Sequence, residues 1–304
     1  MPGDHDVRRQ GILGRHRHAR RHRGGGARRQ RARRRRQFHR HGRRLFRRGI
    51  RDTARRGARR ARTPARAGGR RDLDASLRRL RLDFVDLYQV HGVDLETPIE
   101  ETVGALDDVV RAGKARYVGF CNLPAWLAMQ ALAHADARGL ARFVSAQMYY
   151  SLAGRDIERE VVPLAQDQGL AILPWSPLAG GLLSGKYDLE KPGPAGARRS
   201  TFDFPPVDAS RAKRVLEALR VVSKAADLSV ARVALAWLLT RPFVTSVIIG
   251  AKTREQLADN LGASDARLAP EHVARLDAAS ALPPEYPGWM VERQDQDRRP
   301  PAVG

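Results

Sequence analysis

Residues 84–122 have the sequence FVDLYQVHGVDLETPIEETVGALDDVVRAGKARYVGFCN, in which two short runs rich in β-branched and aromatic residues flank a segment with helical periodicity. One face of the predicted helix carries four apolar residues, Val103, Leu106, Val109 and Val110. Gly113 follows this face and predicts the end of the helix. The order of strand, helix and strand indicates two parallel strands joined by a helical crossover.

The same alternation continues toward the carboxyl end of the chain. Its strand-like runs are residues 84–91, 116–122, 143–150, 171–176 and 244–250, and the first four begin about 30 residues apart, the length of a βα unit. Further helices are expected at residues 126–137, 211–226 and 230–239. Such repetition predicts an α/β fold with parallel strands, either an open doubly wound sheet or a closed barrel. No G-x-G-x-x-G motif follows a strand, which favours the barrel.

The first 71 residues differ in composition from the rest of the chain. They contain 28 Arg, no Lys and three acidic residues, so they account for the formal net charge of +23, and residues 72–304 are near neutral. Because this segment lacks apolar periodicity, we expect it to be disordered. A second hypothesis is that it is an out-of-frame translation of a GC-rich gene, since Arg, Gly and Ala dominate it and Ser, Asn and Tyr are missing. We therefore separate an Arg-rich segment, residues 1–71, from a barrel domain, residues 72–304.

Cysteine usage and hydropathy limit the compartment. Cys121 is the single cysteine, which excludes an intrachain disulfide and a cysteine-rich metal site and suits a reducing cytoplasm. No run approaches 18 apolar residues, and the amino end lacks the apolar region of a signal peptide. We expect a cytoplasmic protein with no metal and no membrane segment.

Polar and aromatic residues stand at the carboxyl ends of the predicted strands. They are His91, Asn122, Gln147, Trp175 and Lys252. Each alone has a structural explanation: Asn122 could be a turn residue, for example, and Trp175 could pack in the core. In a parallel barrel, however, these ends meet on one face, where active sites are built. Together the residues predict one cleft.

Five segments of the chain, in this order and spacing, resemble the aldo-keto reductase family. They are SLRRLRLDFVDLYQVHG (76–92), GKARYVGFCN (113–122), QMYYSLAGRDIE (147–158), WSPLAGGLLSGKY (175–187) and VIIGAKTREQLADN (247–260). The resemblance covers residues 74–282. It implies an eight-stranded (β/α)8 TIM barrel, of which strands four to eight are recognisable here, so that the barrel is incomplete. It also implies an oxidoreductase that uses NADP(H) to reduce aldehyde or ketone carbonyls to alcohols.

The resemblance assigns roles to individual residues. His91 corresponds to the histidine that orients the substrate. The Ser-Asn pair and the Gln that hold the nicotinamide carboxamide correspond to Cys121-Asn122 and Gln147, with Cys121 replacing the usual Ser. Trp175 corresponds to the aromatic residue on which the nicotinamide stacks. The residues that match the pyrophosphate loop are Ser176, Leu178, Gly180, Leu182, Ser184 and Lys186.

The adenosine end of the cofactor has its own set of matching positions. They are Gly250, Lys252, Thr253, Gln256 and Asn260. A lysine beside the start of a helix attracts anions, so this end favours the additional phosphate of NADP over NAD.

Three catalytic residues of the family are missing from this chain. The family's proton-donating tyrosine, the lysine that lowers its pKa from about 10, and the aspartate that pairs with the lysine belong to the first three βα units. Those units would precede Ser76, whereas the first tyrosine is Tyr88 and the first lysine is Lys114. We therefore expect an impaired enzyme in which residues 84–91 form an unpaired sheet edge. Tyr149 and Tyr150 are the candidates for a substitute acid.

Two alternatives come from other functional classes. The first is a catalytically dead barrel that senses nucleotide or binds a partner, and it rests on the retained cofactor positions. The second is a nucleic-acid-binding protein whose Arg-rich segment contacts phosphates. The segment lacks the interleaved aromatic residues of single-strand binders, which speaks against nucleic acid as a partner. A small-molecule carbonyl substrate is the expected partner.

Overall fold

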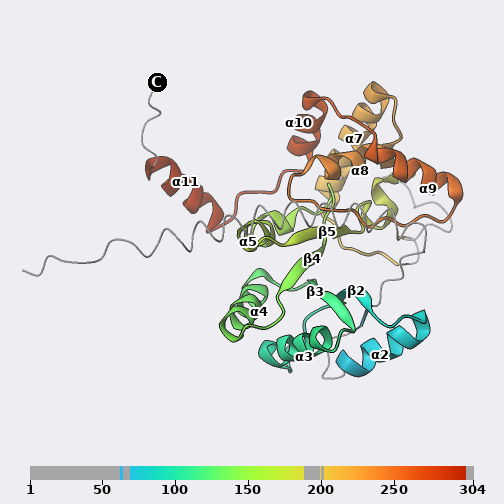
Figure 1. The fold of residues 1–304 in the computed structure, drawn as a ribbon. Coiled ribbons are helices and arrows are strands. Elements are labelled where there is room, and N and C mark those ends of the chain that lie inside the picture. The colour runs from blue at the N-terminus through green and yellow to red at the C-terminus, as the bar shows by residue number, and fades with distance from the viewer. Residues whose placement is uncertain (1–61, 64–68, 188–198, 200–201, 299–304) are drawn as a thin grey trace, which may run out of the picture.

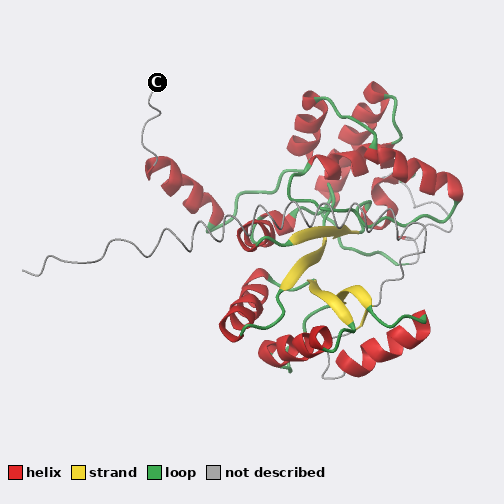
Figure 2. Ribbon diagram, viewed as in Figure 1, coloured by secondary structure: helices red, strands yellow, loops and turns green. Residues whose placement is uncertain are grey.

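A parallel β-sheet forms the centre of the protein. The computed structural model describes residues 62–63, 69–187, 199 and 202–298. Five strands lie in sequential order in one sheet, and every pairing is parallel. They are β1 (Arg62–Thr63), β2 (Val85–Val90), β3 (Ala115–Cys121), β4 (Phe143–Tyr149) and β5 (Ala171–Trp175). The prediction of an α/β fold with parallel strands is confirmed, and Figure 2 shows that the sheet curves from β2 to β5.

Helices connect successive strands and extend the chain beyond β5. The connecting helices are α2 (Gly69–Leu80), α3 (Ile99–Arg111), α4 (Ala125–Arg138) and α5 (Val161–Gln168), with the short helix η1 (Asp156–Glu158) before α5. After β5 come η2 (Ala179–Ser184), α7 (Ala209–Ala226), α8 (Val230–Thr240), α9 (Arg254–Leu261), η3 (Gly262–Ser264), α10 (Pro270–Ala279) and α11 (Gly288–Arg298). In Figure 1, α2, α3 and α4 lie beside β2–β4, α7–α10 gather beyond β5, and α11 projects away from the other elements.

The helices bury the faces that the sequence pattern indicates. Val103, Leu106 and Val109 of α3 are buried against the sheet, as their spacing predicts. In α8, an almost wholly apolar helix, seven residues are buried. Side-chain caps fix the starts of α7 and α8: Asp208 accepts a hydrogen bond from the backbone N of Arg211, and Ser229 accepts one from that of Arg232. One continuous hydrophobic core results from this packing.

The expected strand at residues 244–250 is wrong as a complete strand. Val244 forms only an isolated parallel bridge with Ile172 of β5. Two backbone hydrogen bonds follow, from Thr245 N to Ile172 O and from Ile248 N to Pro174 O, each 2.9 Å long. Pro174 has no N–H, so it cannot donate a backbone hydrogen bond to the segment after Val244. The ladder of hydrogen bonds between β5 and this segment is therefore interrupted at Pro174. The segment runs along β5 without forming a regular strand.

The expectation that residues 84–91 form an unpaired edge is also wrong in part. Arg62 pairs with Gln89, and Thr63 pairs with Val90, so the carboxyl half of β2 has β1 as a second neighbour. The predicted disorder of residues 1–71 falls mostly outside the described residues. Those that are described form β1 or, from Gly69 onward, the start of α2.

Candidate active site

A chain of hydrogen bonds joins the carboxyl ends of four neighbouring strands. The indole Nε1 of Trp175 donates to Asn122 Oδ1 at 3.0 Å, and Asn122 Nδ2 donates to the backbone carbonyl of His91 at 3.2 Å. The backbone N of Asn122 donates to the carbonyl of Gln147 at 3.3 Å. The structure therefore brings His91, Asn122, Gln147 and Trp175 together at one edge of the sheet, where the sequence places them.

Asn122 adopts a conformation that suits its residue type. Its φ is 55°, in the left-handed region that asparagine tolerates better than most side chains. The preceding Cys121 is buried, while the imidazole of His91 is exposed at the end of β2. The turn after β3 thus presents the Asn122 amide to the carboxyl ends of β2 and β5, and His91 is accessible from outside.

Gln147 belongs to a buried polar row that crosses the sheet. Its Nε2 donates to Gln89 Oε1 at 2.8 Å, and Gln89 Nε2 donates to Ser145 Oγ at 3.4 Å. All three side chains are buried. Between them lies Gly119, where an added Cβ would be 2.2 Å from Ser145 Oγ. Sequence reasoning missed Gln89 and Ser145, although a glutamine between the apolar residues Tyr88 and Val90 is a signal for such a row.

The Trp175 ring has two aromatic neighbours. Tyr149 lies at a centroid distance of 5.3 Å and an interplanar angle of 41°, and Phe204 lies at 5.7 Å and 11°, a stacked arrangement. Phe202 in turn contacts Phe204 at 5.4 Å. Sequence reasoning identified Trp175 but missed Phe204, whose only signal is the aromatic pair in the short segment Phe-Asp-Phe.

The loop after β5 has the features of an anion-binding turn. Ser176 Oγ accepts a hydrogen bond from Gly180 N at 2.9 Å, and Gly181 has a φ of 97°. The heavy atoms nearest to a Cβ placed on Gly181 include the Cε and Nζ of Lys186, at 3.9 and 4.0 Å. The position of Gly181 therefore leaves space for a phosphate beside an ammonium group, while the N–H groups of Gly180 and Gly181 bond to Ser176 Oγ and to the carbonyl of Leu178.

Other predicted residues of this loop support it from within. Leu182 is buried, and Leu178 packs partly buried against the core. Ser184 Oγ donates to the carbonyl of Gly181 at 2.6 Å. These contacts assign Leu178, Leu182 and Ser184 to holding the loop in shape.

The positions that match the adenosine end lie in the turn before α9 and within that helix. Thr253 Oγ1 accepts a hydrogen bond from Gln256 N at 3.3 Å, and Gln256 Oε1 accepts one from Lys252 N at 2.9 Å. Asn260 is buried, and its Nδ2 donates to Gly250 O at 3.3 Å. Gln256 and Asn260 therefore stabilise the turn, and the side chains of Lys252 and Thr253 are exposed beside it.

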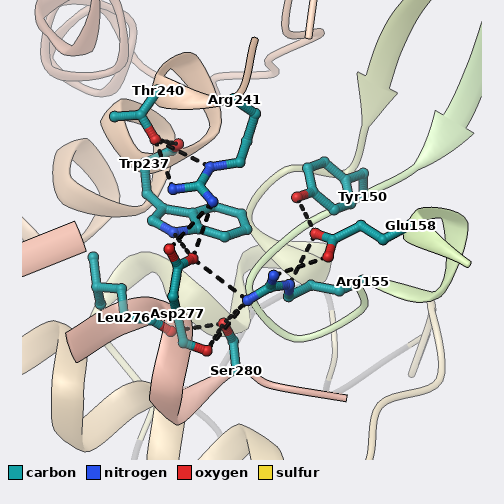
Figure 3. Close-up of polar contacts among 9 residues, drawn as sticks. All are labelled: Tyr150, Arg155, Glu158, Trp237, Thr240, Arg241, Leu276, Asp277 and Ser280. Atoms are coloured by element: carbon teal, nitrogen blue, oxygen red, sulfur yellow. Dashed lines mark hydrogen bonds and ion pairs between the residues drawn. The ribbon is translucent and has the colours of Figure 1, made fainter. Parts of the chain in front are cut away.

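The hydroxyl groups of the two candidate tyrosines are engaged elsewhere. Tyr150 donates to Glu158 Oε1 at 2.5 Å within the polar network of Figure 3. Burial first, and Glu158 second, raise the pKa of Tyr150 above its usual 10.0. Tyr149 is hydrogen-bonded to Ser151 Oγ at 3.0 Å, and burial raises its pKa as well. Both phenols therefore stay protonated at neutral pH.

A separate cavity of about 290 Å³ lies beside the carboxyl end of β2, where Val90 and Gly92 line it. It is bounded by residues 92–102 and by α4, and none of the predicted cofactor-binding residues lines it.

Within the described part of the chain, no helix is both long enough and apolar enough to cross a membrane. The same residues contain no group of three or more His, Cys, Asp or Glu side chains placed to hold a metal ion.

Comparison with known proteins identifies the family. The chain matches the model of the Aldo/keto reductase family over residues 57–281. It is 39% identical over 208 residues to "Uncharacterized oxidoreductase YrpG" of Bacillus subtilis, an alignment that covers 68% of this chain and 62% of the relative. It is 32% identical over 226 residues to "Versiconal hemiacetal acetate reductase" of Aspergillus parasiticus, covering 71% and 63%.

A third relative is similar to a comparable share of the chain. "Protein tas" of Escherichia coli is 34% identical over 227 residues, with coverage of 69% of this chain and 65% of the relative. The chain therefore spans less than two thirds of the length of each of these relatives. The family match extends over all five described strands and over the strand ends that carry the site. This chain belongs to the aldo/keto reductase family.

Proposed function

We propose that this chain is an NADP(H)-dependent oxidoreductase whose reaction is the reduction of aldehyde or ketone carbonyls to alcohols, in the cytoplasm. The observation that carries the proposal is the hydrogen-bond chain from Trp175 through Asn122 to the carbonyl of His91. It brings the indole of Trp175 and the amide of Asn122 to the backbone of His91 at the strand ends. A nicotinamide ring needs an aromatic face and an amide partner for its carboxamide. A carbonyl substrate needs a hydrogen-bond donor, which the imidazole of His91 can be.

Each part of the cofactor has residues that suit it. The amides of Asn122 and Gln147 would hold the nicotinamide carboxamide, and Trp175 would take the ring. The glycine loop and the Lys186 ammonium group would bind the pyrophosphate, since the space at Gly181 lies beside a positive charge. At the far end, Lys252 and the start of α9 would favour a 2′-phosphate. When bound, the cofactor supplies the hydride.

The protein's own contribution is to orient the carbonyl and to provide a proton. The exposed imidazole of His91 can donate a hydrogen bond to the carbonyl oxygen and fix its direction. The Tyr150 hydroxyl donates a hydrogen bond to Glu158, and the Tyr149 hydroxyl is hydrogen-bonded to Ser151. Tyr150 could act as the general acid only by losing that hydrogen bond, and burial raises the pKa of both phenols, which makes them weaker acids. Because general acid catalysis contributes about 10²- to 10⁴-fold, we expect slow turnover.

The test measures binding and turnover separately on the full chain. NADPH and NADH are titrated by calorimetry, and reduction of an aromatic aldehyde is followed by loss of NADPH absorbance. We expect tighter binding of NADPH than of NADH, together with turnover far below that of a relative with the tyrosine and lysine. Failure to bind either nucleotide would contradict the proposal. Turnover equal to that of the relative would show that another residue supplies the proton.

A further inference from the structure

The inference concerns Phe204 and rests on the proposed function. Among the described residues, Phe204 and Trp175 form the one parallel ring stack, with centroids 5.7 Å apart and planes 11° apart. This is the geometry in which a flat heteroaromatic ring lies against an indole. Trp175 is also the residue on which the nicotinamide would stack.

Phe204 is held in this position through its backbone. Arg199, whose side chain is only 8% exposed, donates from Nη1 to the carbonyl of Pro205 at 2.9 Å and to that of Ala179 at 3.0 Å. The carbonyl of Phe204 lies where a Cβ on Gly180 would be only 2.5 Å away. Phe204 is therefore packed directly on the glycine loop, and Arg199 ties the two segments together.

Other contacts of Trp175 limit where a second ring can go. Tyr149 already lies 5.3 Å from the indole, and Nε1 is hydrogen-bonded to Asn122 Oδ1. The Phe204 ring remains 39% exposed, so it can move outward with little loss of core packing. A ligand ring that stacks on the indole would exchange with Phe204, which is the more exposed of the two aromatic neighbours.

We propose that Phe204 is an internal competitor for the nicotinamide ring. It covers Trp175 when the site is empty and must leave when NADP(H) binds, so it lowers affinity for the nicotinamide half of the cofactor and leaves the adenosine half unaffected. Phe204 thereby determines how strongly the complete dinucleotide is preferred over its adenosine fragment.

The test compares two ligands on the full chain by calorimetry. NADPH carries both halves, and adenosine 2′,5′-bisphosphate carries only the adenosine half. Replacing Phe204→Ala should tighten binding of NADPH by about two- to tenfold, because the competent state no longer has to break a ring stack. Binding of the bisphosphate should stay within about twofold of the wild type, since that ligand does not reach Trp175.

Two further variants keep the result interpretable. Phe204→Leu retains bulk without an aromatic plane and should shift NADPH affinity in the same direction if the alanine variant does not fold. Phe84→Ala is a matched control, because Phe84 is 37% exposed and precedes β2 at the opposite end of the strand from His91. The control should bind both ligands as the wild type does.

The possible outcomes separate this inference from the proposed function. Unchanged or weaker NADPH binding by the Phe204 variants, with the wild type still binding both ligands, would overturn the competitor role alone. Equal shifts for NADPH and the bisphosphate would also overturn it, because they would indicate a general change in the loop. If the wild type and the variants bind neither ligand, the proposed function fails and the inference fails with it.

Discussion

The guanidinium group of Arg155 binds both carboxylate oxygens of Glu158, with Nε 2.9 Å from Oε1 and Nη2 2.8 Å from Oε2 (Figure 3). Its third nitrogen, Nη1, donates to Ser280 Oγ at 2.9 Å and to the carbonyl of Asp277 at 3.2 Å. Arg155 thus links the turn after β4 to the end of α10, two segments that are far apart in sequence. The same turn carries Gly154, on which the Tyr149 ring packs closely.

Replacing Arg155→Ala should lower the free energy of unfolding by about 3 kcal/mol, because the charge of Glu158 and several polar groups would lose their partner in a largely buried place. Urea denaturation followed by circular dichroism measures this loss. Arg116→Ala is the control: its ion pair with Asp86 has side chains 61% and 65% exposed, against 13% for Arg155. The control should lose less than about 1 kcal/mol. Equal losses of stability in the two variants would contradict the stabilising role given to Arg155.

Gly119→Ala should destabilise the sheet where the buried polar row crosses it. The new Cβ would lie 2.2 Å from Ser145 Oγ and 2.9 Å from the carbonyl of Ser145, so β3 and β4 must separate. We expect a loss of about 1–3 kcal/mol in the free energy of unfolding. Gly104→Ala in α3 meets no atom within 4 Å and should gain about 0.5–1 kcal/mol instead. A neutral Gly119→Ala would show that the strands are not packed as described.

The contrast between well-predicted and missed features has a physical cause. The helix of residues 99–111 is predictable because its own spacing of apolar residues defines the buried face. The segment after Val244 looks equally strand-like, but whether it pairs depends on Pro174, a residue of the neighbouring strand. Gln89 and Phe204 were missed for a similar reason, since their roles depend on partners that only the fold brings near.

Asn122→Asp should weaken NADPH binding about tenfold, as the loss of a hydrogen bond to a polar partner predicts. The aspartate keeps an oxygen for Trp175 Nε1 and tolerates the φ of 55°. It cannot donate to the carbonyl of His91, which the Asn122 amide does at 3.2 Å. Calorimetric titration measures the change. Gln168→Glu, the same chemical change at the far end of α5, should leave the affinity as it is.

Stability should fall in alkaline solution, and Tyr150 should account for part of the fall. Its pKa in the folded protein is raised above the usual 10.0, so the folded state keeps the phenol proton that the unfolded chain loses. The stabilisation is complete below about pH 10 and declines as the pH rises above that value. Urea denaturation from about pH 9 to about pH 11 checks this. Tyr150→Phe should flatten the decline, and an unchanged slope would assign the effect to other groups.

The Arg-rich segment provides the last prediction, which concerns the gene. Residues 1–71 contain 28 Arg and no Lys, Ser, Asn or Tyr, whereas the family match begins only at residue 57. Basic tails that bind nucleic acid usually mix Lys with Arg and include polar spacers, so this composition is better explained by the GC-rich codons of Arg, Gly and Ala in a shifted frame. The other forward frames should then encode an aspartate, a tyrosine about five residues later and a lysine at the end of a following strand.

Translating the other forward frames has two possible outcomes, and each predicts a different property of the protein. If another frame supplies the aspartate, tyrosine and lysine, restoring it should add the general acid and raise carbonyl reduction by about 10²- to 10⁴-fold over the present chain. If neither frame contains them, the Arg-rich segment is native, and its charge predicts RNA binding that weakens steeply with salt. Filter binding to a generic RNA at two salt concentrations would measure that dependence. A native segment with no affinity for RNA would contradict both explanations of its composition.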